Sequence, residues 1–258
     1  MEQYEHAKQA LQLIDLTSLN DTDTEQSIIQ LCHQAKTGDF HVAALCVYPQ
    51  FIPIAKTTLN QLSLTDVLIA TVVNFPSGND PLDSVISQTK LAIENGADEI
   101  DCVLPYEALM QGDEQSVLTL IQAVKAMCGK QTLKVIIESG MLESDQLIKR
   151  ASELAILAGA DFIKTSTGKV PVNATLCAAN VMLNVIKQSN KQVGFKAAGG
   201  VKTLEQAVEY LDLAAKIMGQ HWINSAHFRF GASGLVHNLQ HVLTEGEPMA
   251  VQSSAADY

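Results

Sequence analysis

Short apolar segments recur along the chain and alternate with longer stretches in which apolar residues follow helical spacing. Eight segments have the length and composition of β-strands: Leu13–Thr17, Ala43–Val47, Val67–Val73, Glu99–Leu104, Leu133–Glu138, Asp161–Thr165, Val193–Ala197 and Phe228–Ala232. Successive segments are about 30 residues apart, which is the length of one strand–helix–strand unit. Because strand–helix units form parallel sheets covered on both faces, eight of them in one chain favour a closed barrel.

The intervals between these segments carry start and stop signals for helices. Asp80 and Pro81 predict a helix with Asp80 as its N-cap and Pro81 at its first position. Gly96 and Gly159 each follow a helical stretch, at the position where a left-handed residue usually ends a helix. An Ala-Asp pair follows each of these glycines and leads into the next strand.

The length of 258 residues is the usual size of one α/β barrel, and no linker divides the chain. We therefore predict one domain over residues 1–258. Its fold is expected to be α/β, a single (β/α)8 TIM barrel with an extra N-terminal helix. Residues 249–258 are small and polar, and we expect them to form a flexible C-terminal tail.

Composition excludes several classes of partner. The formal net charge is −11, which repels a nucleic-acid backbone, and no basic run offsets it locally. Apolar runs are too short to span a membrane and the first residues do not resemble a signal peptide, so we expect a cytoplasmic protein without a membrane partner. The five cysteines are scattered, which predicts neither a disulfide framework nor a metal site.

Two lysines within predicted strands stand beside glycine-rich turns, Lys164 in FIKTSTGK and Lys196 in GFKAAGG. A buried ammonium group is costly unless it is paired or neutralised, so one interpretation is that both side chains reach outward to solvent. The other interpretation is catalytic. Burial and a second cation lower the pKa of one lysine, and its neutral amine attacks a carbonyl carbon to form an imine. We favour catalysis because both lysines stand beside glycine-rich turns.

Two aspartates interrupt other apolar strands. Asp101 follows Asp98 by three residues, as Lys164 follows Asp161, so we expect Asp101 and Lys164 at the same height on their strands. Glu99 shares the strand face of Asp101. Asp101 suits a proton carrier for the lysine, and a purely structural ion pair is the alternative. Asp15 suits either contact with a substrate hydroxyl or a cap on the following helix.

Glycine-rich turns follow the last two predicted strands, Ala198-Gly199-Gly200 and Gly231-Ala232-Ser233-Gly234. Loops after strands 7 and 8 of a barrel often bind phosphate through backbone N–H groups and a helix N-terminus. Gly168-Lys169 adds a cation that can meet the same phosphate. Ordinary tight turns are the alternative, but two such turns at these places favour a phosphate site.

A set of motifs carries a resemblance to a known family. The motifs are LIDLTSLND, ATVVNFPSG, GADEIDCVLPY, KVIIESG, DFIKTSTGK, FKAAGGVKT and RFGAS, which extend from Leu13 to Ser233. With them the chain resembles the deoxyribose-phosphate aldolases, class I enzymes that form a Schiff base on lysine. The resemblance implies reversible cleavage of 2-deoxy-D-ribose 5-phosphate to D-glyceraldehyde 3-phosphate and acetaldehyde, with no cofactor and no metal. It also suggests a homodimer that binds only small phosphosugar and aldehyde substrates.

The resemblance also implies roles for individual residues. Lys164 corresponds to the Schiff-base lysine, Lys196 to the second lysine that lowers its pKa, and Asp101 to the carboxylate of the proton relay. Asp15 corresponds to the residue near the substrate hydroxyl, and Tyr258 to a terminal tyrosine that assists enamine protonation. The positions that correspond to the phosphate site are Gly168, Lys169, Gly199, Gly200, Gly231 and Ser233.

Three positions depart from the family pattern. Ala197 stands where proline is usual, Gly234 replaces a common second serine, and Lys202 stands where arginine is frequent. The second change removes a hydroxyl group from the phosphate region, and the third replaces a planar guanidinium by a point charge. Both changes bear on phosphate affinity.

Two other functions fit the same residues. A phosphosugar isomerase on the same barrel would use Asp101 or Glu138 as a base, without a covalent step. A non-catalytic phosphosugar-binding barrel would use its lysines as ligands only. The fold does not choose among these functions, whereas reductive trapping of acetaldehyde on Lys164 does.

Overall fold

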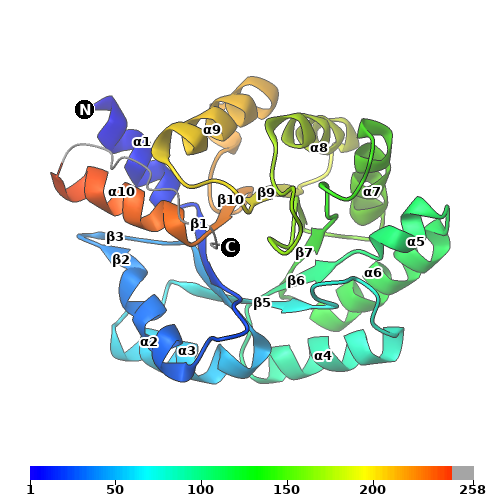
Figure 1. Cartoon of the computed structure of the whole chain (residues 1–258), viewed down its shortest axis with the longest axis horizontal. Helices are drawn as coiled ribbons and strands as arrows, with labels where there is room; N and C mark the ends of the chain where they lie inside the picture. The colour runs from blue at the N-terminus through cyan, green and yellow to red at the C-terminus, as the bar shows by residue number, and fades with distance from the viewer. Residues whose placement is uncertain (246–258) are drawn as a thin grey trace.

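The computed structural model describes residues 1–245, and its centre is a closed barrel of parallel strands (Figure 1). Around the barrel the strands follow the order β1-β10-β9-β8-β7-β6-β5-β4. Their bounds are β1 (Ile14–Ser18), β4 (Ala44–Val47), β5 (Leu68–Val73), β6 (Glu99–Val103), β7 (Thr132–Ile136), β8 (Phe162–Lys164), β9 (Gly194–Ala198) and β10 (Phe228–Ala232). Each predicted apolar segment contributes one of these strands, so the predicted (β/α)8 TIM barrel is confirmed.

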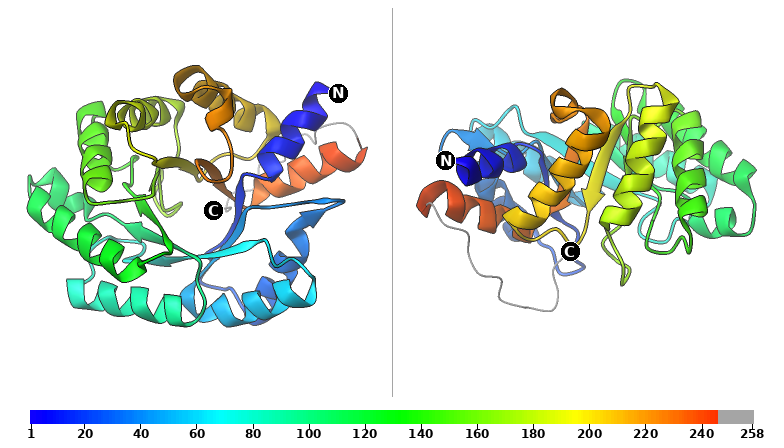
Figure 2. Two further views of the ribbon diagram at one scale, coloured as in Figure 1. Left: turned by 180° about the vertical axis from the view of Figure 1, so that it is seen from behind. Right: turned by 90° about the horizontal axis from the view of Figure 1, so that it is seen from above.

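Helices surround the barrel and alternate with its strands (Figure 2). They are α1 (Glu2–Leu11), α2 (Glu25–Gln34), α3 (Ile52–Gln61), α4 (Leu82–Glu94), α5 (Tyr106–Met110), α6 (Glu114–Cys128), α7 (Asp145–Leu157), α8 (Leu176–Ser189), α9 (Leu204–Met218) and α10 (Gly234–Glu245). The predicted extra N-terminal helix is α1, and it lies beside α10 (Figure 2). Within residues 1–245, none of the helices combines the length and the apolar character needed to cross a membrane.

Short elements complete the chain between the barrel units. A two-stranded antiparallel ribbon follows α2, and one 3-10 turn stands before α3 and another after α9. Their bounds are β2 (Lys36–Thr37), β3 (Phe40–His41), η1 (Pro49–Phe51) and η2 (Gln220–Trp222). None of these short elements belongs to the barrel sheet.

Side-chain caps fix several helix starts. Thr24 and Thr203 form capping boxes at α2 and α9, and Ser144 and Thr175 accept hydrogen bonds from backbone N–H groups at α7 and α8. Such caps satisfy donors that a helix leaves open at its first turn, and each contributes about 1 kcal/mol. The entry angle of these helices onto the barrel is therefore set by local sequence.

The predicted start of α4 is wrong by one residue. Pro81, and not Asp80, occupies the N-cap position, with φ −57° and ψ 141°. The Asp80 carboxylate accepts a hydrogen bond from the Gln88 amide at 2.8 Å instead of capping the helix. The predicted helix ends are confirmed, because Gly96 and Gly159 follow the C-caps of α4 and α7 with φ of 104° and 98°.

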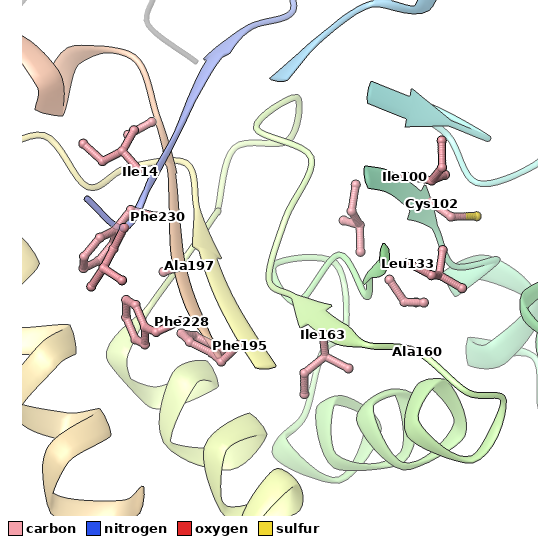
Figure 3. Close-up of a cluster of buried hydrophobic side chains, with 14 of the residues drawn as sticks. Ile14, Ile100, Cys102, Leu133, Ala160, Ile163, Phe195, Ala197, Phe228 and Phe230 are labelled. Atoms are coloured by element: carbon pink, nitrogen blue, oxygen red, sulfur yellow. The ribbon is translucent and has the colours of Figure 1, made fainter. Parts of the chain in front are cut away.

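Every barrel strand except β4 and β5 alternates between apolar residues that face the helices and charged residues that face the barrel interior. Figure 3 shows part of the apolar layer, including Ile14, Ile163 and Phe195. The alternation is seen in Ile14-Asp15-Leu16, Glu99-Ile100-Asp101, Leu133-Lys134-Val135, Ile163-Lys164, Phe195-Lys196-Ala197 and Phe228-Arg229-Phe230. Each fully buried large apolar side chain contributes about 1.5–3 kcal/mol, and this layer compensates for the charges enclosed behind it.

Most predicted strand bounds differ from the observed ones by one or two residues, and two of these differences involve charged side chains. Strand β7 ends at Ile136, and Glu138 has a left-handed backbone with φ of 53°, which cannot continue a strand ladder. Asp161 lies just before β8, where its carboxylate accepts hydrogen bonds from the Leu133 backbone N–H at 2.7 Å and the Lys125 ammonium at 2.6 Å. Backbone hydrogen bonds to the neighbouring strand nevertheless continue at both places, since Ser139 donates to the Thr165 carbonyl at 2.8 Å and Asp161 to the Leu133 carbonyl at 2.9 Å.

We predict that Gly194→Ala destabilises the barrel. A methyl group at Gly194 would lie 2.3 Å from the ring of Phe162, which is buried and packs 5.7 Å from the Arg229 guanidinium. We expect the free energy of unfolding to fall by about 1–3 kcal/mol, the usual effect of overpacking a core. Urea unfolding measures this change. The matched control is Gly234→Ala, where no atom lies within 4 Å of the added methyl group, and equal destabilisation of both variants would contradict the packing argument.

Candidate active site

Seven ionisable side chains meet inside the barrel, and each is at most 4% exposed. They come from six strands: Asp15 on β1, Glu99 and Asp101 on β6, Lys134 on β7, Lys164 on β8, Lys196 on β9 and Arg229 on β10. Four of them were singled out from the sequence, and the structure brings these four into one cluster: Asp15, Asp101, Lys164 and Lys196. The interpretation in which the lysines reach outward to solvent is therefore wrong.

Asp101 is the centre of this cluster. Its Oδ2 atom accepts hydrogen bonds from Lys164 Nζ at 3.0 Å and from Lys196 Nζ at 2.8 Å, and its Oδ1 atom accepts one from Lys134 Nζ at 3.1 Å. Strand register sets these contacts, since Lys164 and Lys196 are direct partners across β8 and β9, and Asp101 and Lys134 across β6 and β7. One carboxylate thus joins three lysines, and Lys164 and Lys196 share one of its oxygens.

Asp15 is a second anchor for the cations. Its Oδ2 atom lies 2.5 Å from Lys196 Nζ and 3.4 Å from Lys134 Nζ, and its Oδ1 atom lies 2.5 Å from an Arg229 nitrogen. The next helix, α2, has Thr24 as its N-cap. The alternative in which Asp15 caps a helix is therefore wrong, because the ion pairs of Asp15 turn it into the barrel.

Three members of the cluster were not singled out as site residues in the sequence: Glu99, which was placed only on the strand face of Asp101, and Lys134 and Arg229, which had no prediction at all. Both contact Glu99, with Lys134 Nζ at 2.5 Å from Oε2 and Arg229 Nη2 at 3.0 Å from Oε1. A signal for them exists, since each stands between two apolar residues of a strand, as Lys196 does. Strict period-two counting over every strand would have placed them in the interior.

The charges of the cluster do not balance when every cation is protonated. Three carboxylates face four cationic groups, so the fully charged cluster carries a net charge of −3 + 4 = +1. An uncompensated buried charge is costly, and a buried lysine usually loses its proton instead. Within residues 1–245, Lys134 has three carboxylate partners, Lys196 and Arg229 have two each, and Lys164 has one. Lys164 is therefore the group that most readily gives up its proton.

The directions of the pKa shifts agree with these numbers of carboxylate partners. Burial lowers the pKa of the Lys164 amine, Asp101 raises it and the charge on Lys196 lowers it again, with a net downward shift. For Lys196, burial is outweighed by Asp101 and Asp15, and its pKa lies well above the ordinary value. Burial also opposes ionisation of Asp101, but the three lysines hold its pKa well below the usual range. Lys134 likewise has a raised pKa, because its three carboxylate partners outweigh its burial.

The loop after β8 is tied to neighbouring loops at the barrel mouth. Thr167 donates to Glu138 from its backbone N–H at 3.2 Å and from its hydroxyl group at 2.5 Å. Burial raises the pKa of Glu138, and the hydrogen bonds of Thr167 reduce that shift without cancelling it. Lys169 is exposed, and its ammonium donates to the Leu19 carbonyl at 2.6 Å. This mouth loop is therefore held by the chain after β7 on one side and after β1 on the other.

The candidate phosphate-binding positions gather at the carboxyl ends of β8, β9 and β10. Gly168, Gly199 and Gly200 have φ of 84°, 77° and 89°, a left-handed conformation that suits glycine. The Gly199 backbone N–H donates to the Gly231 carbonyl at 3.2 Å, so the turns after β9 and β10 are in contact. Ser233 directly precedes α10, whose N-terminus carries partial positive charge. These positions meet at one end of the barrel.

Some predictions stay untested. Tyr258 and the predicted tail over 249–258 lie outside the described residues. Among residues 1–245, no group of three or more His, Cys, Asp and Glu side chains is placed to hold a metal ion. The absence of a metal and of a cofactor remains a prediction about the protein.

The barrel holds its buried lysine cluster behind the carboxyl ends of the strands, the end at which (β/α)8 enzymes place their active sites. Residues 9–238 match the model of the DeoC/LacD family aldolases. The chain belongs to this family, and its family activity is that of an aldolase, which is a lyase acting on small molecules.

Several solved structures share this fold. A structure from Coccidioides immitis, assigned as a deoxyribose-phosphate aldolase, is 31% identical, with a TM-score of 0.78 over 90% of this chain and 85% of that chain. One from Toxoplasma gondii with the same assignment is 24% identical, with a TM-score of 0.88 over 95% of this chain and 98% of that chain. A deoxyribose phosphate aldolase from Aeropyrum pernix, described as tetrameric, is 21% identical, with a TM-score of 0.74 over 94% and 97%. The last two support the fold alone.

We predict opposite effects of two lysine substitutions on stability. Lys196→Met leaves Asp15 and Asp101 short of a buried partner, and we expect the free energy of unfolding to fall by about 3–5 kcal/mol. Lys164→Met removes the surplus amine, and we expect that variant to be at least as stable as the parent near neutral pH. Urea unfolding compares the two, and a loss of equal size in Lys164→Met would contradict the charge count.

We predict that the stability difference between Lys164→Met and the parent becomes smaller as pH rises. A lysine whose pKa is lower in the folded state destabilises that state fully below its folded pKa. The penalty disappears as pH rises past the unfolded value of about 10.4. The advantage of Lys164→Met over the parent should therefore shrink between neutral pH and about pH 10, and an advantage that grows with pH would contradict the downward shift.

Proposed function

We propose that this aldolase reversibly cleaves 2-deoxy-D-ribose 5-phosphate to D-glyceraldehyde 3-phosphate and acetaldehyde through a Schiff base on Lys164. The observation that carries the proposal is the shortage of carboxylate partners at Lys164 within a cluster that has one cation too many. A neutral amine is a nucleophile toward a carbonyl carbon, whereas an ammonium group is not. Asp101 Oδ2 lies within hydrogen-bond distance of both Lys164 Nζ and Lys196 Nζ, at 3.0 and 2.8 Å, and so connects the two amines.

The first stage is imine formation. The Lys164 amine adds to C1 of the open-chain sugar, and the carbonyl oxygen takes up a proton to become a hydroxyl group. The resulting carbinolamine loses water, with the departing oxygen protonated by Lys196, and a protonated imine remains. Lys164 and Lys196 both donate hydrogen bonds to Asp101 Oδ2, and this shared acceptor suits the transfer of protons between the two amines.

The second stage breaks the carbon–carbon bond. A water molecule oriented by Asp101 takes the proton of the C3 hydroxyl group, C3 becomes an aldehyde carbon, and the electrons of the C2–C3 bond enter the imine to form an enamine. Because its pKa is held low, Asp101 stays ionised and orients this water without keeping a proton. A proton is then added to C2, in which Tyr258 assists, and hydrolysis of the imine releases acetaldehyde and restores Lys164.

The substrate phosphate is proposed to bind at the turns after β8, β9 and β10. The residues assigned to this role are Gly168, Lys169, Gly199, Gly200, Gly231 and Ser233. Backbone N–H groups of glycine turns, the N-terminus of α10 and one ammonium group offer complementary charge. Ser166 lies two residues beyond Lys164, in the loop after β8, and has a buried hydroxyl group without a partner among the described residues, which suits contact with a sugar hydroxyl.

The same geometry disfavours the two alternatives. An isomerase needs a free carboxylate base, whereas Glu138 is engaged with Thr167 and Asp101 with three lysines. A simple anion-binding barrel would use charged lysines, and Lys164 is the one whose pKa is lowered. The remaining parts of the proposal are a single domain, a cytoplasmic location, a homodimer and a reaction without cofactor or metal, for which acid–base chemistry and the amine suffice.

We predict covalent trapping of acetaldehyde on one residue. Reduction with sodium borohydride in the presence of acetaldehyde should convert the Lys164 imine to a stable ethyl amine, which mass spectrometry locates on the peptide that contains it. Lys164→Met should remove the adduct and the cleavage of 2-deoxyribose 5-phosphate together. An adduct spread over surface lysines, or turnover that persists in Lys164→Met, would support an isomerase or a binding protein instead.

We predict that Lys169 acts on phosphorylated substrate alone. Loss of a charge-assisted hydrogen bond is worth about 1.5–3 kcal/mol, so Lys169→Met should raise the KM for 2-deoxyribose 5-phosphate about tenfold or more. Cleavage of unphosphorylated 2-deoxyribose should change little. The matched control is Lys130→Met, which removes an exposed lysine from the opposite end of the barrel. Equal losses on both substrates would remove Lys169 from the phosphate site.

A further inference from the structure

The two oxygens of the Asp101 carboxylate have different partners. Oδ2 is shared by Lys164 and Lys196, while Oδ1 accepts a hydrogen bond from Lys134 at 3.1 Å. Lys134 is fully buried, and its ammonium also lies 2.5 Å from Glu99 and 3.4 Å from Asp15. The orientation of the carboxylate is therefore held from both ends.

Lys134 and Glu99, here called the lower pair, lie nearer the amino ends of the strands than Lys164 does. Glu99 stands two residues before Asp101 on β6, and Lys134 stands two residues before Ile136, the register partner of Lys164. Glu99 and Arg229 line an open pocket of about 420 Å³, together with residues at the amino ends of β5, β7 and β8. The candidate phosphate turns lie at the carboxyl ends of the strands, which is the other end of the barrel. A substrate bound at the mouth therefore meets Lys164 before it meets the lower pair, and the lower pair acts on the reaction through Asp101.

We propose that Lys134 is a positioning residue for Asp101, held in place by Glu99 so that Oδ1 points toward the base of the barrel and Oδ2 stays shared between Lys164 and Lys196. Without the contact to Lys134, the Asp101 carboxylate is free to turn both oxygens toward Lys164 and Lys196. The inference deepens the proposed function and rests on it, because sharing of Oδ2 matters only if Lys164 is the reacting amine.

Charge counting gives the lower pair a second effect on Lys164. Loss of Lys134 leaves three carboxylates and three cations, so Lys164 can keep its proton without leaving a net charge. Loss of the Glu99 charge has the reverse effect, because the cluster then has a larger surplus of positive charge. Removing both charges restores the original surplus of one. The charged and titratable groups around Lys164 are Asp101 on β6, Lys196 on β9, Lys134 and Glu138 on or after β7, Asp15 on β1 and Cys46 on β4.

The test compares Lys134→Met, Glu99→Gln and the double variant with the parent. The pKa of the Lys164 amine is measured by NMR titration of protein labelled with ¹³C at lysine Cε, and Lys164→Met assigns the signal. We expect Lys134→Met to raise this pKa by on the order of one unit or more, Glu99→Gln to lower it, and the double variant to return close to the parent. Lys134→Arg, which keeps the charge, should stay nearer to the parent than Lys134→Met.

A second readout separates positioning from a merely structural role. In Lys134→Met the acid limb of the pH profile of kcat/KM should move to higher pH by the same amount as the NMR titration, while KM at the optimum changes little. A fall in kcat at every pH with an unmoved Lys164 pKa would overturn the inference. If Lys134→Met does not fold, Glu99→Gln decides, and an unchanged or raised pKa in that variant would equally overturn it.

The NMR titration does not depend on turnover. If the lower pair shifts the Lys164 pKa as described but no aldehyde is trapped on Lys164, the proposed function fails and the electrostatic coupling stands. If acetaldehyde is trapped on Lys164 but its pKa is the same in all variants, the proposed function stands and the role of Lys134 fails. Different results would therefore contradict the proposed function and the positioning role of Lys134.

Discussion

One surplus positive charge, enclosed in a barrel that keeps water away, is the constraint on which this site depends. Three carboxylates from β1 and β6 face four cations from β7, β8, β9 and β10. Coulomb interactions are several times stronger in such surroundings than in water, so the protons distribute themselves to remove the surplus. Lys164 is the group that most readily loses a proton, because it has one carboxylate partner among the described residues whereas the other cations have two or three. The lowered pKa of Lys164 is therefore a property of the whole cluster and not of one side chain.

Apolar burial around the closed sheet compensates for the free-energy cost of enclosing this charged cluster. Every strand of the cluster carries apolar neighbours that face the helices, so the outer layer supplies the burial that the charged interior lacks. Closure also fixes which charges meet, because Lys164 and Lys196 are register partners on adjacent strands while Asp101 reaches them across the barrel interior. A flat open sheet would keep Lys164 and Lys196 on adjacent strands, but it would not bring Asp101 to them.

The two ends of the barrel have different roles in the proposed reaction. Glycine turns and the N-terminus of α10 gather at the carboxyl ends of the last strands, where an anionic substrate is proposed to bind. The lower pair and Arg229 lie toward the amino ends, beside a polar pocket. Asp101 connects the two ends, since one of its oxygens contacts Lys164 and Lys196 and the other contacts Lys134.

Local sequence determined the eight strands, most helix ends, the inward placement of Asp101 and Lys164, and the family, because these depend on spacing, alternation and motifs within short segments. It could not assign the N-cap of α4 or the left-handed Glu138, whose side-chain hydrogen bonds compete with the regular pattern. Only the tertiary structure decided that Lys134, Glu99 and Arg229 join the site, and which lysine gives up its proton. Proton affinity depends on the summed field of side chains from six strands, and alternation along one strand tells which face a residue occupies but not which charges it meets across the barrel.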